Sequence, residues 1–268
     1  MIGLAILGVV VIMALFANLI VPHDPFAQNL DARFVPPFWM EGGSWKHIFG
    51  TDHLGRDYFS RIIYGARISL VIGISVACIA AVIGVALGVS AGYFGGYVDL
   101  VITFLITARL AVPVILVALA IAALYGSSVK TLIIILGLLL WDRYAIVMRA
   151  SVQQIRELDY VQAAKIQGCS TLRILAAEVL PNVLNNLIVI ATLEMAHAII
   201  LEAALSFLGL GVQPPLPSWG LMVSEGREQI LFDPWLITIP GAFLFMLVLA
   251  INLVGDGLRD VLAPDSRA

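Results

Sequence analysis

The stretch SLVIGISVACIAAVIGVALGVSAG, residues 69–92, contains no charged side chain. A transmembrane helix needs about 20 consecutive apolar residues to cross the hydrocarbon layer of a bilayer. Lipid offers the backbone no hydrogen-bond partner, so a crossing segment of this kind satisfies its own N–H and C=O groups as an α-helix. The stretch therefore predicts a membrane-spanning helix.

The composition of the whole chain agrees with this prediction. The 268 residues are 61% hydrophobic and 12% charged, with a mean hydropathy of +1.01. A soluble domain is about 45–50% apolar and about 25% charged. The apolar runs are long and unbroken, unlike the alternating segments of about ten residues in a membrane barrel. We expect an all-α membrane protein, and the net charge of -3 gives no reason to expect a nucleic-acid partner.

Six segments are long and apolar enough to be transmembrane helices. They cover residues 2–21, 67–92, 99–124, 129–149, 182–205 and 234–255. Residues 1–21 lack the basic start and the cleavage site of a signal peptide, which favours a first transmembrane helix. A soluble loop follows at 22–66, and a core domain of five helices covers 67–268. Lys and Arg are almost equally divided between the two sides, so the positive-inside rule does not choose the orientation.

A polar insert at 150–181 interrupts the apolar pattern and contains ELDYVQAAKIQG, residues 157–168. Asp159 is a predicted N-cap with Gln162 three residues later, as in a capping box. Gly168 is a predicted C-terminal stop. One face of the short helix carries Tyr160, Ala163, Ala164 and Gln167. Physical reasoning leaves two interpretations open: a solvated loop, or a compact projection that fits a socket on a soluble partner.

The spacing within QAAKIQGCSTLRILAAEVLP, residues 162–181, resembles the EAA loop of binding-protein-dependent ABC transporter permeases. The matching positions are Ala163, Ala164, Gly168, Leu180 and Pro181. Gln162 replaces the usual glutamate, which removes a charge and keeps the hydrogen-bonding reach. The resemblance implies a cytoplasmic loop that docks in a cleft of an ATP-hydrolysing subunit. The residues expected to take part are Asp159, Tyr160, Gln162, Ala163, Ala164, Gly168, Leu180 and Pro181.

Two further segments are similar to the C-type permeases of dipeptide and oligopeptide importers, in the peptide and nickel branch of that family. They are GTDHLGRDYFSRIIYGARISL (50–70) and LSFLGLGVQPPLPSWGLMVSEGR (205–227). The resemblance implies a type I importer (MetI-like) permease fold with six transmembrane helices in the bacterial inner membrane. It places the 22–66 loop in the periplasm. It also implies three kinds of protein partner: a homologous second permease, two ABC ATPase subunits, and a periplasmic or lipid-anchored substrate-binding protein.

The sequence gives no indication of an enzyme or of a bound cofactor. A P-loop needs a Gly-Lys pair to hold phosphates, and this chain has none, so we expect partner subunits to bind ATP and Mg. GVSAG at 88–92 matches the nucleophile elbow of hydrolases but ends a long apolar helix, which is the wrong context. Gly84, Gly88 and Gly92 instead predict a stripe of small residues for close helix packing.

Charged groups inside predicted helices are costly and mark candidate functional residues. Four residues are candidates for a translocation path: Arg109, Glu194, His197 and Glu202. Arg109 would meet a peptide carboxylate and Glu194 an amino group. The alternatives are an internal ion pair, a pair with the partner permease or, for Glu202, a structural role near the outer membrane face.

The histidines of the first loop, His23, His47 and His53, are irregularly spaced and have no cysteine near them, so we expect exposed loop residues and no metal site. Several other functions stay open at this point. They are a stand-alone ion-coupled transporter, an intramembrane enzyme, and an ABC permease for nickel, glutathione or opine-like substrates.

Overall fold

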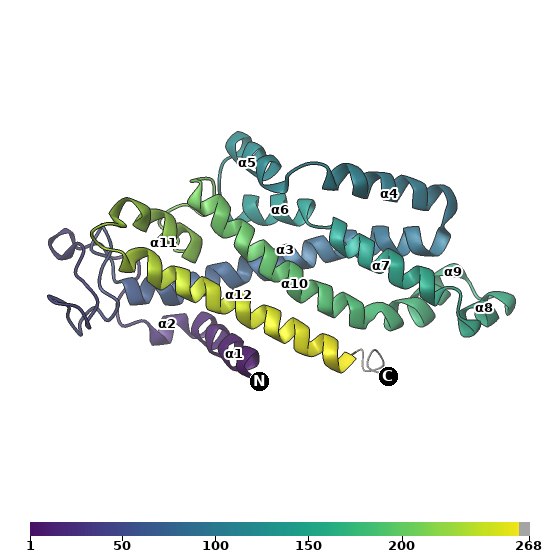
Figure 1. Ribbon diagram of the computed structural model, residues 1–268, viewed down its shortest axis with the longest axis horizontal. Helices are drawn as coiled ribbons and strands as arrows, with labels where there is room; N and C mark the ends of the chain where they lie inside the picture. The colour runs from purple at the N-terminus through teal and green to yellow at the C-terminus, as the bar shows by residue number, and fades with distance from the viewer. Residues whose placement is uncertain (263–268) are drawn as a thin grey trace.

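The computed structural model describes residues 1–262, an elongated helical bundle, so the end of the predicted 67–268 domain lies outside the described residues (Figure 1). The helices are α1 (Ile2–Leu15), α2 (Ala17–Ile20), α3 (Tyr58–Phe94), α4 (Gly96–Leu110), α5 (Val114–Tyr125), α6 (Val129–Leu139), α7 (Asp142–Ile155), α8 (Asp159–Ile166), α9 (Thr171–Ile174), α10 (Leu180–Phe207), α11 (Trp219–Gly226) and α12 (Trp235–Leu262). Short 3₁₀ turns cover Leu30–Ala32 and Arg227–Gln229, and a π-helical turn covers Leu175–Val179. Residues 1–262 contain no β-strand, which confirms the all-α prediction.

Most of the predicted spans correspond to helices of membrane-crossing length. Four helical stretches are long and apolar enough to cross alone: Tyr58–Phe94, Val129–Ile155, Thr171–Phe207 and Trp235–Leu262. Helices α4 and α5 make a fifth candidate if the bent pair crosses as one span. Helix α1 has 14 residues, or about 21 Å at 1.5 Å per residue, which is less than the hydrocarbon thickness of about 30 Å.

The predicted start of the second span, residue 67, is nine residues too late, since α3 begins at Tyr58. The Asp57 side chain caps this helix by accepting a hydrogen bond from the Ser60 N–H at 2.9 Å. The first turns include Arg61, a charge that suggested a water-exposed loop. In the structure Arg61 is buried, because the first loop and α11 cover it with carboxylates.

The predicted span 99–124 corresponds to two helices, α4 and α5, which meet at an angle of 80°. The break falls at Ala111–Pro113. Proline has no N–H for a helical hydrogen bond and disfavours helical backbone at the residue before it. Pro113 therefore ends one helical segment and caps the next, α5.

Helix α3 lies at the centre of the bundle, and glycines allow α7 to pack closely against it (Figure 1). A Cβ atom on Gly84 would lie 2.4 Å from the Trp141 carbonyl oxygen, and one on Gly88 would lie 2.5 Å from that of Ala145. Gly92 meets Arg149 in the same way. The predicted small-residue stripe is confirmed, and its partner is α7.

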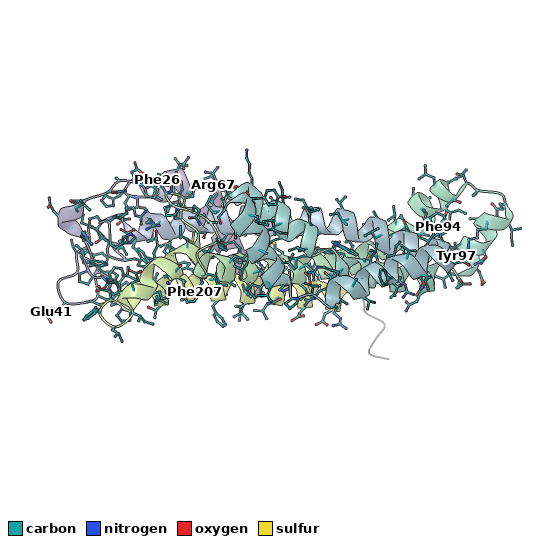
Figure 2. All side chains as sticks on the ribbon, turned by 90° about the horizontal axis from the view of Figure 1, so that it is seen from above. Phe26, Glu41, Arg67, Phe94, Tyr97 and Phe207 are labelled. Carbon is teal, nitrogen blue, oxygen red and sulfur yellow. The ribbon has the colours of Figure 1, made fainter. Side chains whose placement is uncertain are left out.

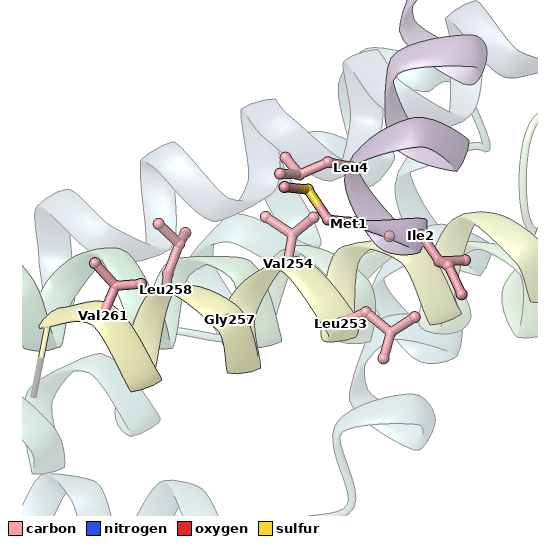
Figure 3. A pocket seen from close by; sticks show the side chains of 9 residues that line it. Met1, Ile2, Leu4, Leu253, Val254, Gly257, Leu258 and Val261 are labelled. Atoms are coloured by element: carbon pink, nitrogen blue, oxygen red, sulfur yellow. The ribbon is translucent and has the colours of Figure 1, made fainter. Parts of the chain in front are cut away.

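The first helix packs against the last one through another close contact (Figure 3). A Cβ on Gly3 would lie 2.7 Å from the Leu253 Cβ atom. Met1, Ile2 and Leu4 line an apolar groove of about 550 Å³ with residues of α12. Helix α1 is thereby joined to the core by α12 and by α3.

The polar parts of the chain gather at opposite ends of the long axis. The loop at 22–57 and α11 lie at one end, and α8 lies at the other (Figure 1). In the perpendicular view Phe26 and Glu41 again lie at one end, and Phe94 and Tyr97 lie toward the other (Figure 2). The two polar regions therefore lie at opposite ends of the long helices.

The loop histidines are not the exposed residues that the sequence predicts. The His47 side chain is 13% exposed and His23 is 33% exposed, and both lie beside the buried carboxylate of Asp57. His53 is also partly buried, near Asp52 and Glu225. The loop folds back on the start of α3. This tertiary contact brings His23 and His47 next to Asp57, although the three residues are far apart in the sequence.

Candidate functional site

Helix α8 is the centre of the candidate coupling site. Its Val161 side chain is fully buried in an apolar cluster with residues of α7, including Met148 and Val152. Gly168 adopts a φ of +77°, which favours glycine, and the Gly168 N–H donates to the Lys165 carbonyl. The predicted stop at Gly168 is confirmed. The short helix is thus anchored by one face and ended by a defined turn.

The predicted capping box at the start of α8 is wrong. Leu158 occupies the N-cap position, and Asp159 is the first helical residue, without a side-chain capping bond. Gln162 does not turn back to Asp159. Its Nε2 donates to the carbonyl of Arg156 at 2.7 Å instead. The carboxylate of Asp159 still lies in the first turn, where a negative charge interacts favourably with the helix dipole.

The predicted face of α8 lines an open groove of about 350 Å³ between this helix and the segment that leads into α10. Its lining residues are Tyr160, Ala163, Ala164, Gln167, Cys169, Arg173, Ile174 and Glu178. Large apolar side chains project nearby, with Ile166 86% exposed and Leu172 78% exposed. Such side chains on a water-exposed projection indicate a surface that another protein covers.

Polar contacts connect this projection, which we call the elbow (residues 156–170), to α3. The Arg156 guanidinium donates to the Gly92 carbonyl at 2.9 Å, and Gln162 holds the Arg156 backbone. The Lys165 ammonium lies 5.4 Å from the centre of the Tyr93 ring. A displacement of the elbow would therefore act on the end of α3.

The elbow also leads directly into α10. Helix α9, the π-helical turn and α10 form one continuous helical stretch from Thr171 to Phe207. Leu180 and Pro181 stand at the start of α10, and Pro181 occupies its first turn, where a proline needs no N–H donor. The Asn182 side chain donates to the Glu178 carbonyl in the π-helical turn. The elbow is therefore joined to α10 through a continuous helical stretch.

Two of the predicted path residues lie together in the middle of α10. The Glu194 carboxylate is 1% exposed and forms an ion pair of 3.0 Å with Arg143 of α7. His197 approaches the other oxygen of Glu194, at 3.3 Å. Arg143 is 54% exposed, although it belongs to a long apolar stretch. The selection from the sequence missed Arg143, and the only available signal was a charge within the apolar run 129–149.

The other two predicted path residues lie elsewhere. Arg109 is at the end of α4, where its Nε donates to the Leu139 carbonyl at 2.6 Å. Glu202 is fully buried and accepts hydrogen bonds from the hydroxyls of Ser206 (2.7 Å) and Ser218 (2.9 Å). Ser218 also caps α11. The partners of Glu202 favour the structural alternative, in which it joins α10 to α11.

At the opposite end of the molecule, a buried network of charges holds the first loop to α3 and α11. Asp52 pairs with Arg61 and, at 2.6 Å, with Arg56. Both arginines also pair with Glu225, at 3.2 and 2.9 Å. Burial works to raise the pKa of Asp52, but the Arg61 and Arg56 guanidiniums and the N–H groups of Arg56 and Leu54 outweigh it, so this pKa lies below its usual range.

Comparison with solved structures shows the same fold. The chain aligns with an inward-facing structure of the MetNI methionine ABC transporter at a TM-score of 0.62 and 15% identity. The alignment covers 76% of this chain and 96% of the solved chain. A second crystal form of the same transporter also gives a TM-score of 0.62.

Curated relatives match along nearly the whole sequence. The Di/tripeptide transport system permease protein DppC of Pseudomonas aeruginosa (strain UCBPP-PA14) is 43% identical over 98% of this chain and 86% of its own length. The Dipeptide transport system permease protein DppC of Escherichia coli (strain K12) is 45% identical over 98% of this chain and 88% of its own length.

Two family descriptions match successive parts of the chain. Residues 1–37 match the N-terminal TM domain of oligopeptide transport permease C. Residues 84–268 match the binding-protein-dependent transport system inner membrane component. The elbow, the intramembrane charges of α10 and most of the spanning helices lie within this second range. The chain therefore belongs to the family of binding-protein-dependent ABC transporter permeases, and it is a multi-pass, non-enzymatic transport subunit of the bacterial inner membrane.

Proposed function

We propose that this permease forms half of a translocation path for di- and oligopeptides, driven by ATP hydrolysis on two separate ATPase subunits. A homologous second permease supplies the other half. One of the two curated relatives is named for di/tripeptide transport and the other for dipeptide transport, and both align over 98% of this chain, which supports a peptide substrate. ATP and Mg bind to the ATPase subunits in this proposal.

The elbow is the observation that carries the proposed mechanism. It projects from the bundle at the end opposite to the 22–57 loop, it exposes Ile166, with Leu172 exposed just after it in α9, and it is joined to both α3 and α10. In the proposal the elbow lies in the cytosol and docks on an ATPase subunit. Closure of the ATPase pair then moves α3 and α10 together and alternates the access of the path.

The opposite end would receive the substrate from a periplasmic or lipid-anchored binding protein. The buried charges of Asp52, Arg56, Arg61 and Glu225 fix the first loop against α11, so that this end forms one rigid surface. A rigid docking surface reduces the entropy lost on binding. The binding protein would supply most of the affinity for peptides.

Arg143, Glu194 and His197 are the proposed polar position within the path. A guanidinium that is 54% exposed in the middle of a span is unfavourable against lipid and is expected to face a wet cavity or another protein. Arg143 would meet the carboxylate of a passing peptide. Glu194, already paired with Arg143 and His197, would meet its amino group.

A pair of substitutions at Gly168 tests the docking of the elbow. A Cβ atom at this position meets no atom within 4 Å, but the φ of +77° strains any other residue. Asn tolerates this backbone conformation better than most residues, so Gly168→Asn controls for strain, whereas Gly168→Trp adds bulk toward the partner. We expect Gly168→Trp to lower ATP-driven peptide uptake at least tenfold in proteoliposomes that contain the assembled complex, with normal membrane insertion.

The same assay separates the proposal from its rival. Gly168→Asn should retain most of the uptake. Equal uptake by Gly168→Trp and the native chain would contradict docking through this surface. Uptake driven by a proton gradient in vesicles that lack the ATPase subunits would contradict ATP-driven transport and favour an ion-coupled transporter. The ATPase rate with binding protein loaded with different dipeptides tests the substrate class.

A further inference from the structure

Two histidines and an aspartate meet where the first loop returns to the start of α3. His23 and His47 lie in the loop, and Asp57 is the N-cap of α3. One donor atom from each of these residues lies within 4.8 Å of the other two. The Asp57 Oδ1 atom is 2.8 Å from the His47 Nδ1 atom and 3.7 Å from that of His23.

The two carboxylate oxygens of Asp57 contact different groups. Oδ2 accepts hydrogen bonds from the Ser60 N–H at 2.9 Å and from the Ser60 hydroxyl at 2.7 Å, which caps the helix. Oδ1 faces the two imidazoles. The His23 Nδ1 atom is buried, and it has no hydrogen-bond partner among the described residues. A buried nitrogen without a partner is unusual, since unsatisfied polar groups are costly. This one lies 3.7 Å from the Asp57 Oδ1 atom, which already forms a hydrogen bond of 2.8 Å with the His47 Nδ1 atom.

The electrostatic surroundings favour a cation at this cluster. Within residues 1–262, no Arg or Lys forms an ion pair with Asp57, whose side chain is 2% exposed. A second group, formed by Asp52, His53 and Glu225, has the same size but a different environment. There the two carboxylates are already paired with two arginines, which leaves no negative charge for a metal ion.

We propose that His23, His47 and Asp57 form a binding site for one divalent transition-metal ion of the zinc type, on the side of the molecule that carries the first loop. Imidazole nitrogen and carboxylate oxygen are zinc ligands, with bonds of about 2.0–2.2 Å. In a tetrahedral site such bonds place donor atoms about 3.4 Å apart. The observed 2.8 and 3.7 Å lie on either side of this value.

The ion would connect three separate points of the chain. Ligand positions 23, 47 and 57 enclose most of the first loop, and the last of them begins α3. Three protein ligands leave a fourth position for water or for a group from another protein. The metal would consequently hold the loop against the helix and make the shape of this surface depend on metal occupancy.

The test uses the full-length chain in nanodiscs, stripped of metal with EDTA, and Zn²⁺ as the probe. Equilibrium dialysis with elemental analysis should give one Zn²⁺ per chain. His23→Gln and His47→Gln should each weaken the affinity at least tenfold. His53→Gln and His197→Gln are matched controls at histidines outside the cluster, and both should bind Zn²⁺ as the native chain does.

Thermal melting provides a second measurement. Zn²⁺ should raise the melting temperature of the native chain and of both controls, because a ligand that binds only the folded state stabilises it. It should not raise that of His23→Gln or His47→Gln, although in EDTA all five proteins should unfold cooperatively. Fewer than one Zn²⁺ per chain, or unchanged binding in the double variant His23→Gln/His47→Gln, would overturn the proposed site and leave the peptide-transport proposal unaffected.

Discussion

A few buried charges hold together the end of the molecule that carries the first loop. Asp52 neutralises two guanidiniums that the fold buries, since Arg61 is fully buried and Arg56 nearly so. Removal of one partner from a buried ion pair typically costs about 3–5 kcal/mol, because the remaining charge is left without compensation. The stability of this end therefore depends on a few residues of the GTDHLGRD segment.

Asp52→Asn should lower the stability of the chain at neutral pH and should change its pH dependence. The folded-state pKa of Asp52 lies below its unfolded value of about 3.9. Its contribution is therefore complete above that value and is lost as the pH falls through the folded-state pKa. Melting temperatures of the native chain and the variant should differ most near neutral pH and converge in acid. Asp31→Asn, at an exposed carboxylate, is the control, and a constant difference across the pH range would contradict this role.

Elements pack closely where glycine is present, and the contact between α3 and α7 shows this most clearly. In a helix Gly→Ala ordinarily stabilises by about 0.5–1 kcal/mol. At Gly88 the new Cβ would lie 2.5 Å from the Ala145 carbonyl oxygen, so that overpacking, at about 1–3 kcal/mol, should outweigh the gain. Gly88→Ala should lower the melting temperature. Gly8→Ala, where a Cβ meets nothing within 4 Å, should not, and equal melting temperatures for both would contradict the packing role.

Local chemistry made several elements predictable from the sequence. Gly168 ends α8 because its positive φ favours glycine. The glycines of α3 form a contact face because a side chain there would clash with α7. The capping box failed because the chain enters α8 one residue earlier than the pattern suggests, with Gln162 turned toward Arg156. The first turns of α3 were missed because their charge is neutralised by Glu225, a residue distant in the sequence.

At the scale of the whole molecule, the candidate site also combines features that the sequence predicts with contacts between distant residues that it does not predict. The elbow is expected from the resemblance of residues 162–181 to an EAA loop, but its connections to Gly92 and Tyr93 depend on how α3 ends beside it. Glu194 was selected as a charge inside a span, whereas its partner Arg143 was not. Arg143 and Glu194 are 51 positions apart in the sequence, so no local sequence pattern predicts their ion pair.

A charge in the middle of a spanning helix should affect transport more than folding if it faces the path. Arg143→Gln removes the guanidinium while Glu194 keeps His197 as a partner, so the buried carboxylate is not left alone. We expect a severalfold lower initial rate of ATP-driven dipeptide uptake at saturating loaded binding protein, with unchanged amounts of chain in the membrane. Arg259→Gln, at an exposed arginine of α12, is the control. Equal rates for the two variants would show that Arg143 serves only as an internal partner of Glu194, and the path would then have to be lined by other residues.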